Sequence, residues 1–470
     1  MRVVSVTIGI AVLQLVILLL LARLLGPGEY SVYSVYFSVA TSLAALLAEW
    51  IRLVVARFSG VRGDRLRGAI LHSALTLVLI LAAACLAIAG GAAVLAASLG
   101  IRSLVAPVAA VGVLTASNMI GDMLHTVIRF NRGVRPYAVY AGLRVGASGV
   151  LAVLAGAAYA TADAAVLGFA VGGSLVVASA FGRFWSPRAR PVPYRRLVRF
   201  VKVGWAMAIS SISSLVALSL ARILMQSAAP PRTADAMLLA FDLSQRGLTV
   251  LGAGLTTWLS KALYKAAHAR GAVGLAPTSA LTSTVFGITW NSFAIYGSAC
   301  ALAIPIALHG RGVYGGHEWA AALNVLAGVI LSGRIYNLEP ILFSVHRYGW
   351  TLRASLLGLA IMVAFWIVAV LRLPVATEFL GLPVAVIASL AAIAPLARAV
   401  PSVRSGLANL AMAALLGMAI FALLLRGASA FHPALLAVSL PVLAVNAAWL
   451  VRLSLRYRRD AREVGALLAS

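Results

Sequence analysis

Long runs of apolar residues, separated by short polar and basic segments, dominate the sequence. The runs at 3–21 and 69–99 are about as long as, or longer than, the roughly 18–20 residues that cross a bilayer as a helix. They do not alternate apolar and polar residues with a period of two, as barrel strands would. Because backbone groups in lipid must be hydrogen-bonded within their own segment, these runs predict transmembrane helices.

Read in order, the runs predict about fourteen membrane helices and therefore an all-α, polytopic integral membrane protein. The expected helices span residues 3–25, 31–55, 69–98, 104–128, 137–160, 164–185, 201–226, 235–260, 278–308, 319–344, 351–371, 380–397, 407–425 and 433–453. The longest loop is basic and contains three prolines, and it separates the first six helices from the rest. We expect an N-terminal six-helix bundle, a basic cytoplasmic linker, a C-terminal six-helix bundle, an added helix pair and a basic cytoplasmic tail, at 1–185, 186–200, 201–397, 398–453 and 454–470.

Composition agrees with a membrane protein, and the distribution of charge predicts its orientation. The chain of 470 residues is 62% hydrophobic and only 11% charged, and its net charge is +26. The basic residues lie mainly in alternate loops, for example 57–67, 183–202 and 452–462, whereas the loops between them hold few. By the positive-inside rule, both termini and the basic loops lie in the cytoplasm. We therefore interpret the charge as orientation in the cytoplasmic membrane and attraction to membrane lipids, with no nucleic-acid partner.

Charged residues inside the predicted helices are the candidate functional residues, because each costs about 2.5–3.5 kcal/mol near the bilayer centre. The candidate substrate-binding residues are Arg23, Arg52, Arg144, Arg222, Arg246 and Arg334. The acids, which are candidates for ion coupling, are Glu49, Asp122, Asp242 and Glu339. Arginine binds phosphate and carboxylate through forked donors and keeps its charge when desolvated. The excess of arginine over acid therefore favours an anionic cargo.

Each of these charges also has a structural interpretation. Glu49 with Arg52, and Asp242 with Arg246, have the spacing of pairs that neutralise each other on one helix face. Arg23 and Arg222 lie near helix ends and can extend to the lipid headgroups. Arg144 has no acid nearby in sequence, and we expect Asp122 and His125 on the preceding helix to face it. Arg334 and Glu339 are five residues apart, which predicts partners on other helices.

A short internal repeat relates the two halves of the chain. The first helix ends in Ala-Arg-Leu-Leu at 22–25, and the seventh ends in Ala-Arg-Ile-Leu at 221–224. Both helices start from the cytoplasm, so the repeat is parallel, about an axis along the membrane normal. Transporters often place a central cavity between such halves.

Aromatic residues gather near the start of the second helix, at Tyr30, Tyr33, Tyr36 and Phe37. Their simplest interpretation is a belt at the membrane interface. Stacking against a sugar is the alternative, since aromatic faces bind amphipathic ligands.

Two segments carry a resemblance to a known family. Residues 22–33, Ala-Arg-Leu-Leu-Gly-Pro-Gly-Glu-Tyr-Ser-Val-Tyr, resemble a segment near the start of Wzx-type polysaccharide flippases of the multidrug/oligosaccharidyl-lipid/polysaccharide (MOP) exporter superfamily. Residues 240–246, Ala-Phe-Asp-Leu-Ser-Gln-Arg, with Tyr264 following, resemble the eighth-helix region of exopolysaccharide exporters in that group. A departure is Pro230-Pro231, which stands where Leu-Gly-Pro is common.

The resemblance implies two six-helix bundles, often with two added C-terminal helices. It implies a flippase that moves an undecaprenyl-pyrophosphate-linked oligosaccharide outward, with the polysaccharide polymerase and export machinery as partners. The alternatives are the same fold acting on a peptidoglycan precursor or on drugs, a membrane polymerase or ligase, and a non-transporting subunit of an export complex.

No nucleotide-binding loop of the form Gly-x-x-x-x-Gly-Lys-Ser/Thr is present in the sequence. We therefore expect coupling to a proton or sodium gradient, without a metal or organic cofactor. No reactive group set in a sizeable outer loop is visible, so an enzyme is not expected.

Overall fold

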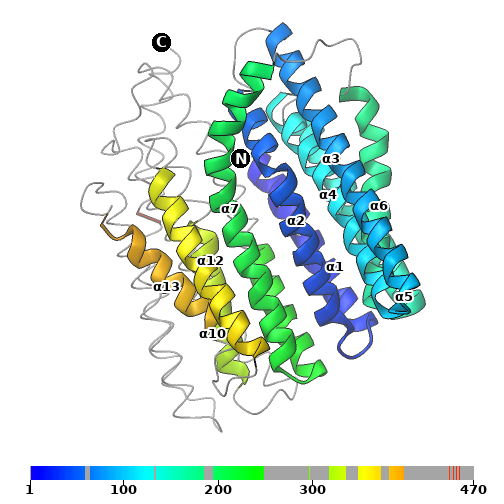
Figure 1. Ribbon diagram of the computed structural model, residues 1–470, viewed down its shortest axis with the longest axis vertical. Coiled ribbons are helices and arrows are strands. Elements are labelled where there is room, and N and C mark those ends of the chain that lie inside the picture. Colours follow the sequence, from blue (N-terminus) through cyan, green and yellow to red (C-terminus); the bar gives the residue numbers. More distant parts are fainter. Residues whose placement is uncertain are drawn as a thin grey trace. The chain divides into compact units, whose positions relative to one another are not determined.

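The computed structural model describes residues 2–58, 64–131, 134–184, 194–247, 296, 317–334, 348–371 and 380–395, with 444, 448, 451–452 and 455. Within these residues the regular structure is entirely helical, without a strand (Figure 1). The expected all-α class is confirmed.

The helices follow the apolar runs of the sequence. In unbroken order they are α1 (Arg2–Leu24), α2 (Glu29–Phe58), α3 (Asp64–Ser98), α4 (Val105–Asn131), α5 (Val134–Tyr159), α6 (Ala162–Phe184) and α7 (Tyr194–Ala228). A short 3-10 turn, η1 (Arg102–Leu104), precedes α4. A helical segment at 231–247 follows α7, and further on lie α10 (His317–Gly333), α12 (Tyr348–Val370) and α13 (Gly381–Ile393).

The predicted helix boundaries differ most where polar residues continue a helix beyond its apolar run. α3 begins at Asp64 and α7 at Tyr194, several residues before the expected starts, because the helix continues through the polar and basic residues that precede each apolar run. The helices expected at 278–308, 407–425 and 433–453 lie outside the described residues apart from isolated positions, so the count of fourteen stays a prediction.

The surface of the helices confirms an integral, multi-pass membrane protein. Seven of the described helices are long and apolar enough to cross a membrane. Large apolar side chains on their outer faces are more than half exposed, including Ile88, Val94 and Leu154. In water such a surface would be unstable, whereas against lipid tails it is the expected exterior.

The chain divides into two compact units, residues Met1–Leu239 and Ala240–Ser470. α7 belongs to the first unit because it packs along α2 (Figure 1). The second half of the predicted linker at 186–200 is helical, because α7 already begins at Tyr194. The grouping of the whole chain into two six-helix bundles stays a prediction.

α2 and α4 form the centre of the first unit. α4 packs against α2, α3 and α6, and α5 packs against α1 and α6. Buried apolar side chains of α2, α3 and α4 make one continuous core, including Ile51, Val55, Leu75, Met123 and Leu124. This core holds one face of α2 firmly against α3 and α4.

α5 and α6 approach closely because α6 carries glycine at the contact. Gly168 and Gly172 are four residues apart and face Leu151 and Ala147 of α5, where an added Cβ would meet the backbone carbonyl groups. Small residues with this spacing let helix backbones pack tightly in membranes.

The aromatic residues at the start of α2 are inside the unit. Tyr30 and Tyr33 are 1% and 2% exposed, and Phe37 packs edge-on against Phe169 of α6 with ring centroids 5.1 Å apart. The expectation of an interfacial belt is wrong for Tyr30 and Tyr33, because neighbouring helices cover this turn of α2.

In the second unit, polar side chains lie between apolar helices. α13 packs against α10 and α12. Ser332 of α10 donates a hydrogen bond of 2.8 Å to the Gln245 side-chain oxygen. Gly328, one turn earlier on α10, faces the same glutamine and Phe241, which leaves no space for a side chain.

Candidate functional site

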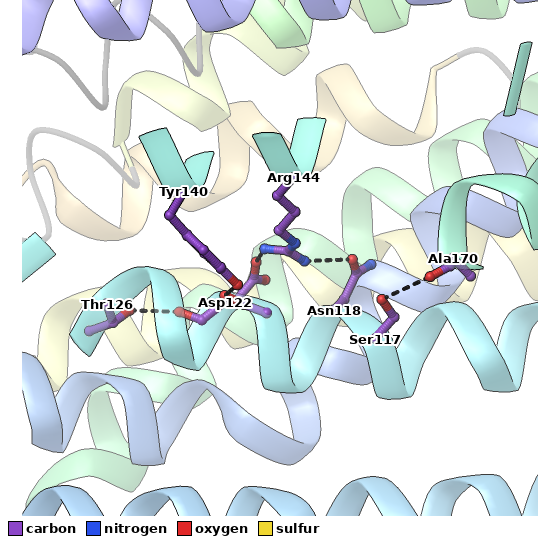
Figure 2. A network of polar contacts seen from close by, with 8 residues as sticks. Ser117, Asn118, Asp122, Thr126, Tyr140, Arg144 and Ala170 are labelled. Atoms are coloured by element: carbon purple, nitrogen blue, oxygen red, sulfur yellow. Dashed lines mark hydrogen bonds and ion pairs between the residues drawn. The ribbon is translucent and has the colours of Figure 1, made fainter. Parts of the chain in front are cut away.

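The most developed polar site in the first unit is centred on Arg144 of α5. Its guanidinium reaches α4, where Nη1 donates to Asp122 Oδ1 at 2.6 Å and Nη2 donates to Asn118 Oδ1 at 3.1 Å (Figure 2). Asn118 and Asp122 are four residues apart and so share one face of α4. The acid expected to face Arg144 is therefore found, together with an amide that sequence reasoning did not single out.

Gly121 makes room for this guanidinium. A Cβ at position 121 would lie 2.6 Å from Arg144 Nε and Nη2, so only glycine allows the planar group to lie against the α4 backbone. The Tyr140 hydroxyl donates to the Gly121 carbonyl at 3.1 Å, one turn of α5 before Arg144. Asn118, Gly121 and Asp122 thus form a cradle for the arginine head group.

Aromatic rings border the cradle on one side. His125 lies 4.7 Å from the Tyr137 ring and 6.5 Å from the Tyr140 ring, measured between centroids. The Thr126 hydroxyl bonds back to the Asp122 carbonyl at 2.9 Å (Figure 2). His125 therefore packs with the tyrosines beside the ion pair.

The two members of the ion pair differ in exposure. The Asp122 side chain is 41% exposed and that of Arg144 is 15% exposed. Arg144 lies nine residues into the apolar span 135–159, which is about 14 Å along a helix. The pair thus lies within an apolar span, with its carboxylate partly exposed and its guanidinium mostly covered.

A second ion pair lies on α2. Arg52 donates to Glu49 at 2.5 Å, with the Glu49 side chain 9% and the Arg52 side chain 39% exposed. The expected pairing of these residues is confirmed.

Serine hydroxyls connect α2 with α7. Ser219 lies 2.7 Å from the Ser38 hydroxyl and 2.8 Å from the Ser42 hydroxyl, and it also contacts the Ser38 and Leu215 carbonyls. A hydroxyl has one proton, so when Ser219 donates to a carbonyl it accepts from both serines. Arg222 Nη1 donates to the Ser38 hydroxyl at 3.2 Å. We call Ser38, Ser42, Ser219 and Arg222 the serine seam.

The other candidate residues lie in different surroundings. Arg23 is exposed at the end of α1, as expected for a side chain extending to the headgroups. In the second unit Arg334 is 1% exposed and donates to Ser355 of α12 at 2.7 Å, which confirms a partner on another helix. Asp242 is buried and Arg246 half-buried, while Glu339 lies outside the described residues.

An inter-helix contact missed in the sequence involves Asp235. Its two carboxylate oxygens accept the backbone N–H groups of Gly28 and Ser31, at 2.7 and 2.8 Å. Asp235 is about two hundred residues from these partners, and no sequence spacing relates them. Among the described residues, no group of three or more metal-ligating side chains is found.

Comparison with solved structures identifies the class of fold. The chain is similar to the lipid II flippase MurJ in an inward closed conformation, with 10% identity, a TM-score of 0.59 and coverage of 97% of this chain and 98% of MurJ. It is similar to an inward-facing multidrug resistance MATE family transporter of the MOP superfamily, with 14% identity, a TM-score of 0.56 and coverage of 87% and 98%.

A third similar structure is a MOP superfamily transporter from Pyrococcus furiosus, described as having a binding pocket of reverse polarity that suggests a different function. It shares 14% identity, with a TM-score of 0.55 and coverage of 88% of this chain and 96% of that one. The chain thus has the fold of MOP superfamily transporters, and the matched proteins named here are transporters or a flippase. No family model and no curated protein matches the sequence.

Proposed function

We propose that this protein is a flippase that moves an anionic, undecaprenyl-pyrophosphate-linked oligosaccharide from the inner to the outer leaflet of the cytoplasmic membrane. The observation that carries the proposal is the Arg144 cradle, which holds a cationic head group within an apolar span, paired with a carboxylate that is 41% exposed. A lipid pyrophosphate has the negative charge and the oxygen acceptors that a guanidinium binds.

In this mechanism Asp122 is the resting counter-ion of Arg144. An isolated arginine within the membrane is costly, and Asp122 supplies a partner while no cargo is bound. An entering pyrophosphate displaces the carboxylate and takes over the guanidinium donors, and Asp122 returns when the cargo leaves. Asn118, which carries no charge, stays hydrogen-bonded to Arg144 Nη2 and so holds the arginine in place during the exchange.

Alternating access of two helical bundles, driven by a proton or sodium gradient, completes the proposal. Glu49, Asp122, Asp242 and Glu339 are the candidate coupling acids. Arg222, at the serine seam, extends the cationic path within the first unit. In this proposal both termini lie in the cytoplasm, which the basic loops favour by the positive-inside rule.

The second candidate is flipping of lipid II, favoured by the similarity to MurJ over nearly the whole chain. A multidrug antiporter is a weaker alternative, because arginines outnumber acids among the candidate intramembrane charges of this chain. A competition assay separates these cargoes. Flipping of a labelled undecaprenyl-pyrophosphate oligosaccharide is measured while each unlabelled candidate cargo is added in turn, and the true substrate suppresses it.

The deciding experiment measures flipping of that fluorescent lipid in proteoliposomes. Arg144→Ala should reduce the rate by at least about tenfold, since a hydrogen bond to a charged group contributes roughly 1.5–3 kcal/mol. The matched control is Arg102→Ala, which removes the same charge from an exposed position on η1. Asp122→Asn should bind the lipid more tightly and release it more slowly, because no counter-ion competes. Wild-type activity in Arg144→Ala, or transport of organic cations alone, would overturn the proposal.

A further inference from the structure

Three loops are joined at one end of the first unit. The α1–α2 loop contacts the α5–α6 loop through a bond from the Gly26 N–H to the Ala160 carbonyl at 3.2 Å. Glu29, the first residue of α2, accepts the Ala162 N–H at 2.7 Å. The same loop contacts the segment after α7, through the two bonds to Asp235.

The bonds to Asp235 supply what the start of α2 lacks. The first N–H groups of a helix have no partner within it, and a side chain just before the helix commonly accepts them. Residue 28 is glycine, which has no side chain to do so. Asp235 instead binds the Gly28 and Ser31 N–H groups with both oxygens, and its negative charge suits the positive end of the helix dipole.

The contact is also closely fitted. Gly28 has φ +83°, a conformation that favours glycine, and a Cβ there would lie 3.0 Å from Pro231 Cβ. The α1–α2 loop therefore rests directly on the turn that precedes Asp235. This is the Pro230-Pro231 turn in which the sequence departs from the common Leu-Gly-Pro.

Below this contact, α2 is held differently on its two sides. Toward α3 and α4 it presents the apolar core that includes Ile51 and Val55. Toward α7 it presents the serine seam, whose small hydroxyls can exchange their partners for water when the helices part. If α2 separates from α7, water can therefore satisfy the serine hydroxyls. The apolar core of α2 against α3 and α4 stays intact.

We propose that Asp235 is the latch that closes this end of the transport path. The path opens when the Asp235 carboxylate leaves the Gly28 and Ser31 N–H groups and α2 and α7 separate along the serine seam. The positive-inside rule places this end on the outer face of the membrane. The proposal concerns how the path closes and applies to whichever cargo the protein carries.

The test measures access to the serine seam without any cargo. Ser42→Cys, in a background in which Cys85 and Cys300 are replaced by alanine, is labelled with a membrane-impermeant maleimide in right-side-out vesicles. Adding Asp235→Asn should raise the labelling rate about tenfold or more, because the amide has only one acceptor oxygen and no charge. The control Asp163→Asn removes an acid from the first turn of α6 and should label like the parent.

A reversible cross-link provides the second measurement. Ser38→Cys with Ser219→Cys, at two hydroxyls 2.7 Å apart, places two thiols across the serine seam, so oxidation should stop transport and reduction should restore it. Labelling of Asp235→Asn at the parental rate, or full transport by the oxidised pair, would overturn the latch. Since labelling needs no cargo, these results are independent of whether undecaprenyl-pyrophosphate oligosaccharide is the substrate.

Discussion

Replacing Gly121 by alanine should impair transport while leaving every charge in the protein in place. The added methyl group would lie 2.6 Å from Arg144 Nε and Nη2, which is well inside van der Waals contact. The α4 backbone cannot retreat, because it lies in the centre of the first unit against α2, α3 and α6. The guanidinium must therefore leave the cradle, and its bonds to Asn118 and Asp122 are broken or lengthened.

The expected magnitude differs between stability and transport. A hydrogen bond to a charged group contributes about 1.5–3 kcal/mol, reduced here because the Asp122 side chain is 41% exposed. Alanine in place of glycine returns up to about 1 kcal/mol of helix propensity. The net change in stability should thus be within about 1–2 kcal/mol. Transport, which needs the guanidinium in place, should fall about tenfold or more.

The assay pairs lipid flipping in proteoliposomes with thermal unfolding in detergent. Gly142→Ala is the matched control, because a Cβ at position 142 meets nothing within 4 Å. It should transport like wild type and be equally or slightly more stable. Wild-type flipping by Gly121→Ala would refute the reasoning, since it would show that the position of Arg144 on α4 is not needed.

Two further substitutions test the packing of the first unit. Gly172→Ala places a methyl group 2.6 Å from the Ala147 carbonyl carbon of α5, so it should destabilise the fold by about 1–3 kcal/mol or prevent folding. The control Gly182→Ala, where a Cβ meets open space, should unfold like wild type in detergent. Ser219→Ala removes the central hydroxyl of the serine seam and should lower stability by about 1–3 kcal/mol. The control Ser98→Ala lies on an exposed turn, and its stability in thermal unfolding should stay within about 0.5 kcal/mol of wild type. Equal unfolding temperatures within either pair would contradict its packing argument.

Sequence alone was sufficient to predict an integral membrane protein and the course of the helices in the described part of the chain. Runs such as 69–98 must be helical in lipid, because their backbone groups have no other partners there. Local spacing also determined the Glu49–Arg52 pair, since three residues on a helix place both side chains on one face. The contact between Asp122 and Arg144 could be expected from the free-energy cost of an unpaired charge in lipid, because two opposite charges on neighbouring helices lower that cost by pairing.

Which faces of these helices meet is known from their packing in the folded protein. Tyr30 and Tyr33 are as compatible with an interface belt as with a core, and their burial depends on neighbours distant in sequence. Asn118 and Gly121 carry no signal of their own, and they become a cradle only when Arg144 of α5 lies across them. The contact of Asp235 with Gly28 and Ser31 joins segments about two hundred residues apart. Apolar periodicity sets how a helix runs in a membrane, whereas the partners of its polar groups follow from helix packing, which local sequence does not encode.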